Sequence, residues 1–388
     1  MLHNDMKLSK DELSRYSRHI ILNDFGIQGQ EKLKAAKVLV IGAGGLGSPV
    51  LLYLAAAGVG TIGIVDFDVV DETNLQRQVL FTVHDIGKPK ADIAAARLKA
   101  LNPFVNIIPF PLQFTSQNAL GIIRDYDIVV DGTDNFQTRY LVNDACVLLN
   151  KPNVYGSIYQ FEGQVSVFNY TDAGGVLGPN YRDLYPTPPP PGLVPSCEEG
   201  GVLGVLPGII GSLQANEVLK VITEIGTPLS GRLFLFDALK LESRIVKFSR
   251  DENNPINGKN PTLKELIDYD EFCGIKNSGR KTDSVQEISV KELKQWIDSK
   301  KDFQLIDVRE PFEHPLVNIG GELIPLSRIE ERIDLVSLDK PVIIYCKTGI
   351  RSAKAIKVLL AKGKFNLYNM TGGIIAYASE IDPSLPRY

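Results

Sequence analysis

A glycine-rich segment, Gly42-Ala43-Gly44-Gly45-Leu46-Gly47, lies between a run of apolar residues and a helix-like segment. Glycines at this kind of junction let the backbone approach phosphate groups at the N-terminus of a helix. Asp66 ends the next apolar run, where a carboxylate can accept hydrogen bonds from ribose hydroxyls. These two features predict a nucleotide site, but a nicotinamide-dependent dehydrogenase would carry them too.

Two cations and a second acid distinguish the alternatives. They lie in Asn74-Leu75-Gln76-Arg77-Gln78, at Lys90 where a helix-like segment begins, and in Asp131-Gly132-Thr133-Asp134-Asn135. Hydride transfer has no use for such charges around the phosphates, whereas Arg77 and Lys90 could neutralise charge that builds on a cleaved ATP. Asp134 could hold Mg²⁺, a hard ion that takes oxygen ligands. We therefore expect a site that cleaves ATP.

Other polar residues near these motifs have weaker assignments. Asp131 could cap the helix that follows it, and we give it that structural role. Asp68 and Asn135 are second-tier candidates for contact with the nucleotide. Arg18, from its surroundings alone, is best explained as a surface partner of the nearby Asp11 or Glu12.

A second candidate site centres on Cys346, in Tyr345-Cys346-Lys347-Thr348-Gly349-Ile350-Arg351-Ser352. Because an apolar run precedes this segment and a helix-like one follows it, the loop can curl until backbone amides converge on the sulfur. The helix N-terminus and Arg351 add positive potential, which favours the thiolate and makes Cys346 a candidate nucleophile. A buried structural cysteine would not explain this loop.

The other three cysteines are weaker candidates. Cys197 lies beside Glu198 and Glu199, whose charges disfavour a thiolate, so we expect a secondary role for it. Cys146 falls in an apolar helix-like segment and is expected in the core. Cys273 is expected to be structural or neutral.

The first 250 or so residues resemble the ubiquitin-activating-enzyme superfamily, in its MoeB and ThiF adenylyltransferase branch. The likeness rests on Arg18, the Gly42 to Gly47 loop, Asp66, Asn74 to Gln78, Lys90 and Asp131 to Asn135, in the correct order and spacing. It implies adenylation of the C-terminal Gly-Gly carboxylate of a small ubiquitin-like carrier, with release of pyrophosphate. It also implies a homodimer in which Arg18 reaches the partner's nucleotide, reversing the surface interpretation of that residue.

One part of the family pattern is missing. MoeB-like enzymes commonly carry two CxxC pairs that bind structural zinc, but the matching positions here read Asn180-Tyr181-Arg182-Asp183 and Asp270-Glu271-Phe272-Cys273. One thiol is left where tetrahedral zinc takes four nitrogen or sulfur ligands. We therefore predict no zinc, and the sequence does not indicate what else holds these two segments together.

The chain from Ile288 onward resembles the rhodanese family. The likeness rests on the segments 305–313 and 371–377 together with the Cys346 loop, although Asn318 stands where a histidine is usual. A phosphatase of related fold would need a longer loop around phosphorus, so the loop from Cys346 to Arg351 favours sulfur. The resemblance implies that a persulfide on Cys346 attacks the activated carrier, and that Cys197 assists reductive release of a thiocarboxylate.

Composition agrees with a protein of several domains and excludes some partners. Lys and Arg (42) and Asp and Glu (46) give a net charge of −4 with both signs interspersed, so no nucleic-acid partner is implied. Residues 38–65 carry no charge, but seven glycines and Pro49 predict a buried strand, helix and strand rather than a membrane span. The scattered cysteines and the lack of a signal pattern predict a reducing, cytoplasmic location.

The elements that must position these sites follow from the apolar pattern. Alternating strands and helices predict a doubly wound Rossmann-like sheet, extended by antiparallel or mixed strands near 163–169, 233–236 and 245–248. A small α/β rhodanese-like domain should follow. Low apolar content places a linker at 251–284, between an adenylyltransferase domain at 1–250 and the second domain at 285–388.

The predicted function is thus ATP-dependent adenylation of a Gly-Gly carrier followed by sulfur transfer. The sulfur would come from thiosulfate or a cysteine desulfurase. A nucleotide-dependent oxidoreductase and a non-catalytic scaffold that binds the carrier are the alternatives. The carrier could serve molybdopterin, thiamine, cysteine or tRNA sulfur metabolism, and the sequence leaves these pathways open.

Overall fold

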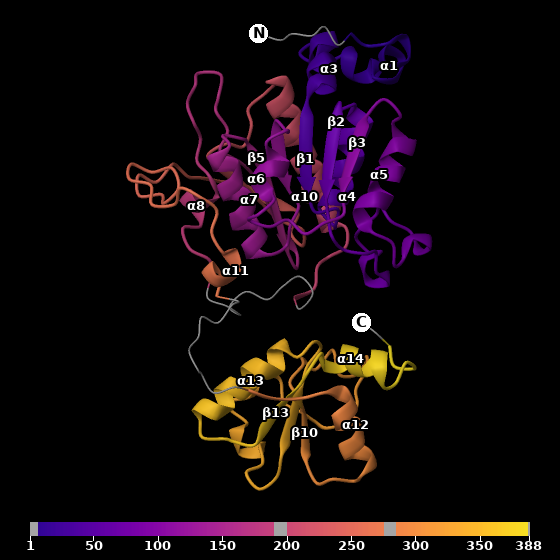
Figure 1. Cartoon of the computed structure of the whole chain (residues 1–388), viewed down its shortest axis with the longest axis vertical. Coiled ribbons are helices and arrows are strands. Elements are labelled where there is room, and N and C mark those ends of the chain that lie inside the picture. Colours follow the sequence, from indigo (N-terminus) through magenta and orange to yellow (C-terminus); the bar gives the residue numbers. More distant parts are fainter. Residues whose placement is uncertain (1–6, 190–199, 275–284, 387–388) are drawn as a thin grey trace. The chain divides into compact units, whose positions relative to one another are not determined.

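The computed structural model describes residues 7–189, 200–274 and 285–386. The chain divides into two compact units, Met1–Ser278 and Gly279–Tyr388 (Figure 1). Each unit has its own sheet and its own hydrophobic core, and each is described by itself below.

The first unit contains an eight-stranded sheet in the order β3-β2-β1-β4-β5-β6-β7-β8. The strands are β1 (Lys37–Ile41), β2 (Thr61–Val65), β3 (Asn106–Phe110), β4 (Ile128–Asp131), β5 (Asn153–Tyr159), β6 (Glu162–Phe168), β7 (Arg232–Asp237) and β8 (Glu242–Lys247). Strands β1 to β5 are parallel, and β6 to β8 continue the sheet in antiparallel fashion. The predicted doubly wound sheet with a mixed extension is confirmed.

Helices cover both faces of this sheet. They are α1 (Lys10–Arg15), α2 (Ser17–Ile20), α3 (Gly26–Ala35), α4 (Gly47–Ala57), α5 (Lys90–Leu101), α6 (Ala119–Ile123), α7 (Phe136–Leu148), α8 (Tyr181–Leu184), α10 (Leu206–Thr223) and α11 (Tyr269–Phe272). Alternate residues of β1 enter different cores: Val38 and Val40 pack with α4, α5 and α10, whereas Leu39 and Ile41 pack with α6 and α7. Burial on both faces explains the uninterrupted apolar runs.

The uncharged stretch 38–65 forms β1, α4 and β2, as predicted. Helix α4 is apolar on nearly all sides because the sheet and α10 enclose it, and it ends at Gly58 in the left-handed conformation. Among the described residues, no helix is long and apolar enough to cross a membrane.

Residues 251–274 differ from the linker that their composition predicts, because they pack onto the first unit. Asn254, Ile256, Tyr269 and Cys273 are buried, and the last two belong to the core beside α7. A few buried anchors hold this polar segment in place although it lacks apolar periodicity.

The second unit is a small parallel sheet with helices, as predicted. Its strands are β9 (Gln286–Ile288), β10 (Gln304–Asp307), β11 (Glu322–Leu323), β12 (Val342–Tyr345) and β13 (Leu367–Met370), in the order β11-β10-β12-β13-β9. Its helices are α12 (Val290–Asp298), α13 (Ile350–Ala361) and α14 (Gly373–Glu380). The central strand β12 is buried on both faces, and the loop that follows it carries Cys346.

Candidate functional site

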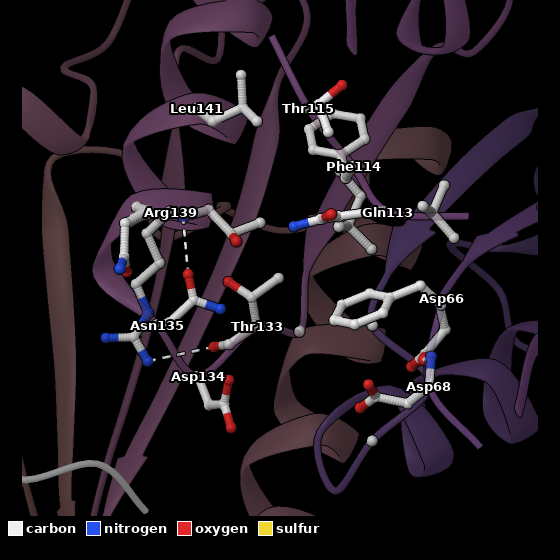
Figure 2. Close-up of a pocket in the computed structure, with 18 of the residues that line it drawn as sticks. Asp66, Asp68, Gln113, Phe114, Thr115, Thr133, Asp134, Asn135, Arg139 and Leu141 are labelled. Carbon is white, nitrogen blue, oxygen red and sulfur yellow. Dashed lines mark hydrogen bonds between the residues drawn. The ribbon is translucent and has the colours of Figure 1, made fainter. Parts of the chain in front are cut away.

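A cavity of about 780 Å³ opens at the carboxyl ends of the parallel strands in the first unit. The loops after β1, β2, β3 and β4 all line it, and β1 and β4 are the neighbours between which the strand order reverses. Ligands of open α/β sheets bind at this switch point. Figure 2 shows Asp66 and Asp68 on one side of the cavity and Asp134, Asn135 and Arg139 on the other.

The glycine-rich loop forms the floor of the cavity through Gly42, Gly44 and Gly45. Gly47 does not line it but begins α4, and a Cβ there would lie 1.9 Å from the carbonyl oxygen of Gly42. The tight turn therefore requires glycine at this position. The N-cap of α4 is Leu46, which has no side-chain acceptor. The Ser48 amide donates to the Gly44 carbonyl at 2.9 Å, so the first turn of α4 is closed onto the loop, and the positive end of the helix dipole faces the loop.

Asp66 is buried at the end of β2 and fixes this loop. Its Oδ2 accepts a hydrogen bond from the Ala43 amide at 2.8 Å, and its Oδ1 accepts one from the Asp68 amide at 2.9 Å. Burial raises the pKa of the Asp66 carboxyl from its ordinary value. Asp66 also lines the cavity, and each of its oxygens can accept a second hydrogen bond, so this geometry is compatible with the predicted ribose contact.

The two predicted cations both line the cavity. Lys90 is the first residue of α5 and is 5% exposed, and its Nζ lies 3.1 Å from the Asp68 carboxylate. Arg77 donates to the Thr73 carbonyl at 3.0 Å, within the segment that joins β2 to α5. The connection from β2 to the start of α5 thus places two positive charges in one cavity.

The 131–135 loop supplies the opposite wall. Asp134 and Asn135 line the cavity and are exposed, and the Asp134 carboxylate forms no hydrogen bond or ion pair within the part of the chain that the structure describes. The cap of α7 is Asn135, whose Oδ1 accepts from Thr138, so the expected capping role of Asp131 is wrong. Asp131 is buried and instead accepts hydrogen bonds from the Thr133 amide and hydroxyl.

Sequence reasoning missed several residues of the cavity. Arg139, 7% exposed, donates to the Thr133 carbonyl at 3.2 Å and so supports the loop that carries Asp134 (Figure 2). Two whole segments, 112–117 and 266–270, form a further wall, joined where the Ser116 hydroxyl donates to the Ile267 carbonyl at 2.7 Å. Arg139 lies four residues after Asn135, the N-cap of α7, and this spacing indicates that the two residues lie on the same side of the helix. No comparable sequence pattern marks the two wall segments.

Other predicted site residues lie elsewhere. Asn74 ends a short 3₁₀ helix (Glu72–Asn74), and its Oδ1 accepts a hydrogen bond from the Asp71 amide. Gln76 is exposed and packs against Gly204. Arg18 in α2 is exposed and pairs with neither Asp11 nor Glu12 among the described residues, since Glu12 pairs with Lys34 at 2.7 Å. Cys197 lies outside the described residues.

In the second unit, Cys346 follows β12 and its side chain is buried. The Gly349 amide donates to the Cys346 sulfur at 3.1 Å, and the Ser352 hydroxyl lies 3.5 Å from it. Gly349 is the N-cap of α13 with φ of 99°, a left-handed conformation that favours glycine. The curled loop thus aims an amide and the N-terminus of α13 at the sulfur.

Arg351 departs from the expected arrangement, because its charge is matched. Its guanidinium forms a bidentate pair with the Glu313 carboxylate at 2.6 and 2.8 Å, and both side chains are largely buried. Positive potential at the sulfur therefore comes from the helix N-terminus more than from Arg351. The pair ties the 309–317 segment, anchored by the buried Asp307–Arg309 pair, to the start of α13.

The remaining cysteines are structural in character. Cys146 is buried in α7, and burial raises the pKa of its thiol well above the ordinary value.

Burial also raises the pKa of the Cys273 thiol to about 11, which disfavours the thiolate that zinc requires. The other positions of the zinc pattern are satisfied internally: the Asp183 carboxylate accepts from the Asn180 amide at 2.7 Å and from Asn254 at 2.6 Å. These residues do not fit a zinc site.

The first unit combines a doubly wound sheet with a glycine loop, two cations and an acid at its switch point. The second unit presents a cysteine loop. Together these features are typical of two-part nucleotide-dependent transferases. Comparison with known proteins identifies the family. Residues 16–256 match the ThiF family, and residues 289–380 match the rhodanese-like domain. The chain belongs to the ThiF family, and its second unit is a rhodanese-like domain.

Relatives of the whole chain agree. It is 49% identical over 385 residues to "Probable adenylyltransferase/sulfurtransferase MoeZ" of Mycobacterium tuberculosis, covering 98% of this chain and 96% of that protein. It is 56% identical over 271 residues to "Sulfur carrier protein adenylyltransferase" of Thermus thermophilus, covering 70% of this chain and 100% of that protein. The chain is therefore a transferase that combines adenylyltransferase and sulfurtransferase units.

Solved structures support the fold of the first unit. Escherichia coli MccB in complex with MccA-N7isoASN has a TM-score of 0.56 and 23% sequence identity, covering 64% of this chain and 75% of that chain.

Proposed function

We propose that the first unit uses ATP to adenylate the C-terminal Gly-Gly carboxylate of a ubiquitin-like sulfur carrier, and that Cys346 then delivers sulfur to the activated carbonyl. One observation supports the first half most strongly: the glycine loop, Arg77, Lys90 and Asp134 face a single cavity. This set of charges suits the cleavage of ATP better than hydride transfer.

The adenylation step uses the cavity as follows. A carboxylate oxygen of the carrier attacks the α-phosphorus of ATP, the bond from that phosphorus to the bridging oxygen breaks, and pyrophosphate leaves. The positive end of the α4 dipole and the side chains of Arg77 and Lys90 balance the negative charge that moves onto the leaving group. Asp66 holds the ribose.

The donor set at the cavity also fits Mg²⁺. The exposed carboxylate of Asp134, with no partner among the described residues, is an oxygen ligand of the kind that this ion prefers. When bound, Mg²⁺ would neutralise phosphate charge. Asn135 contributes by capping α7, which fixes the loop that presents Asp134.

Sulfur transfer uses the second unit. The terminal sulfur of a persulfide on Cys346, loaded from thiosulfate or a cysteine desulfurase, attacks the acyl carbon, and the bond to AMP breaks. This forms an acyl disulfide between the carrier and Cys346. A second thiolate attacks the Cys346 sulfur, so that the carrier leaves as a thiocarboxylate and an enzyme disulfide remains. We assign this last step to Cys197.

The exposed position of Arg18 fits a homodimer in which this residue serves the partner's cavity, because it does not line the cavity of its own chain. The chemistry of thiolates and persulfides suits a reducing cytoplasm.

Exchange of labelled pyrophosphate into ATP tests the first half of this proposal. The exchange should require a carrier that ends in Gly-Gly and should be lost when the last glycine is removed. Tight binding of the carrier without exchange would identify a scaffold, and oxidation of NADH by the protein would identify an oxidoreductase. Either result would overturn the proposal.

A further inference from the structure

A buried ionic network joins three helices of the first unit. The Arg182 guanidinium in α8 donates to both carboxylate oxygens of Asp144 in α7, each at 2.7 Å. The Tyr269 hydroxyl in α11 donates to the same carboxylate at 2.7 Å. All three residues are 5% exposed or less, and Arg182 also lies over the rings of Tyr140 and Phe272, 4.9 and 4.8 Å from their centroids.

The polar side chains of this network are hydrogen-bonded to one another. Asp144 accepts a further hydrogen bond from the Asn143 side chain at 3.0 Å. Burial, and next the neighbouring Asp144 carboxylate, raise the pKa of the Tyr269 hydroxyl, so it remains a donor at any working pH. The arginine and the two further donors compensate the buried carboxylate. Removing the arginine would leave the Asp144 charge buried without its counter-ion, and removing the tyrosine hydroxyl would take away one hydrogen bond to that charge.

This network ends at the wall of the nucleotide cavity. Residues 266–270 line the cavity directly before and within α11. The Ser116–Ile267 hydrogen bond joins this segment to the other wall segment, 112–117. Helix α7, which carries Asp144, begins at the loop that presents Asp134. Figure 1 shows α7, α8 and α11 together at one side of the unit.

We propose that Asp144, Arg182 and Tyr269 are positioning residues that brace the 266–270 wall against α7 and thereby determine how tightly the cavity holds a nucleotide. The inference rests on the proposed function, since it takes ATP as the ligand. The same network joins the two segments, around 180–183 and 270–273, whose family pattern would hold zinc, so an ion pair here takes the place of a metal.

Two single substitutions act on the brace in different ways. Tyr269→Phe removes one hydrogen bond and keeps the ring in its place. Arg182→Lys keeps the charge but loses the bidentate geometry, and Arg182 does not line the cavity, so any effect on nucleotide must pass through the wall. Matched controls are Tyr126→Phe, in a buried tyrosine of the same core, and Arg97→Lys, in an ion pair with Asp85 elsewhere in the unit.

Hydrogen–deuterium exchange of the full chain measures the wall without reference to ATP. Both test variants should accelerate amide exchange in residues 266–273 by about tenfold, because a hydrogen bond to a buried charge is lost, while the controls leave that segment unchanged. Calorimetric titration with ATP and Mg²⁺ should show a Kd roughly three- to tenfold weaker in the test variants alone. Pyrophosphate exchange should show a higher KM for ATP with a similar kcat.

The outcomes separate the brace from the proposed function. Unchanged exchange in residues 266–273 of both test variants would overturn the brace. Faster exchange with unchanged ATP affinity would also overturn it, since the network would then be structural only. Failure of the wild-type chain to bind ATP would overturn the proposed function, whereas the amide exchange would still decide whether the network holds the wall.

Discussion

Replacing Lys90 by alanine separates catalysis from stability. The Lys90 side chain is 6% exposed and its ammonium pairs with Asp68, whose side chain is 50% exposed. Because the Asp68 partner is half-exposed, water screens the pair, and such a pair contributes about 0–1 kcal/mol; we therefore expect the free energy of unfolding to fall by about 1 kcal/mol. Asp68 is left in contact with water and needs no new partner.

The catalytic loss should be larger. Removing one preorganised charge from the site of a transition state costs roughly 2.7–4 kcal/mol, or about 10²- to 10³-fold in kcat. We would measure carrier-dependent pyrophosphate exchange at saturating ATP, together with thermal unfolding. Lys88→Ala, in an exposed lysine two residues earlier, is the control and should retain wild-type exchange.

Exchange by Lys90→Ala within about threefold of wild type, less than 1 kcal/mol of barrier, would refute the reasoning. So would a loss of activity that follows loss of the folded state.

Three further predictions concern the metal and the sulfur. Elemental analysis after chelator washing should find no stoichiometric zinc, because the Asn180 and Asp183 side chains are engaged and the Cys273 thiol is protonated; about one zinc per chain would contradict this. Cys346→Ala should abolish formation of the persulfide and of the carrier thiocarboxylate, yet leave pyrophosphate exchange intact. Cys197→Ala should keep the persulfide on Cys346 and slow only the release of the carrier. A persulfide mapped by mass spectrometry to Cys197 alone would reverse these roles. Glu313→Ala should destabilise the second unit by about 3 kcal/mol, since it leaves the Arg351 guanidinium buried without its carboxylate, and unchanged thermal unfolding of that unit would be the contrary result.

Much of the fold could be read from local pattern. Strands β1, β2, β4 and β12 are buried on both faces and therefore appear as uninterrupted apolar runs. The glycine loop, Asp66 and the 131–135 loop follow such runs directly, so their meeting at one edge of the sheet is predictable from the topology of parallel strands. The extension by β6 to β8 was visible as alternation.

The parts that were missed depend on contacts between distant segments. The cavity wall at 266–270 comes from a polar segment whose placement depends on Tyr269 and Arg182, some 87 residues apart and both joined to Asp144. Neither residue shows its partner by spacing or type. Arg351 looked like a free cation beside the cysteine, but its charge is matched by Glu313 from another loop. The local sequence pattern predicts helices and strands, whereas ion pairs between distant residues form only when the chain has folded.

The most direct measurement is the intact mass of the carrier. A carrier ending in Gly-Gly would be incubated with the full chain, ATP, Mg²⁺ and thiosulfate, and its mass determined after removal of small molecules. The proposed chemistry predicts that one oxygen of the terminal carboxylate is replaced by one sulfur, in a reaction that requires both ATP and Cys346. A carrier of unchanged mass under these conditions, or one converted in the absence of ATP, would contradict it.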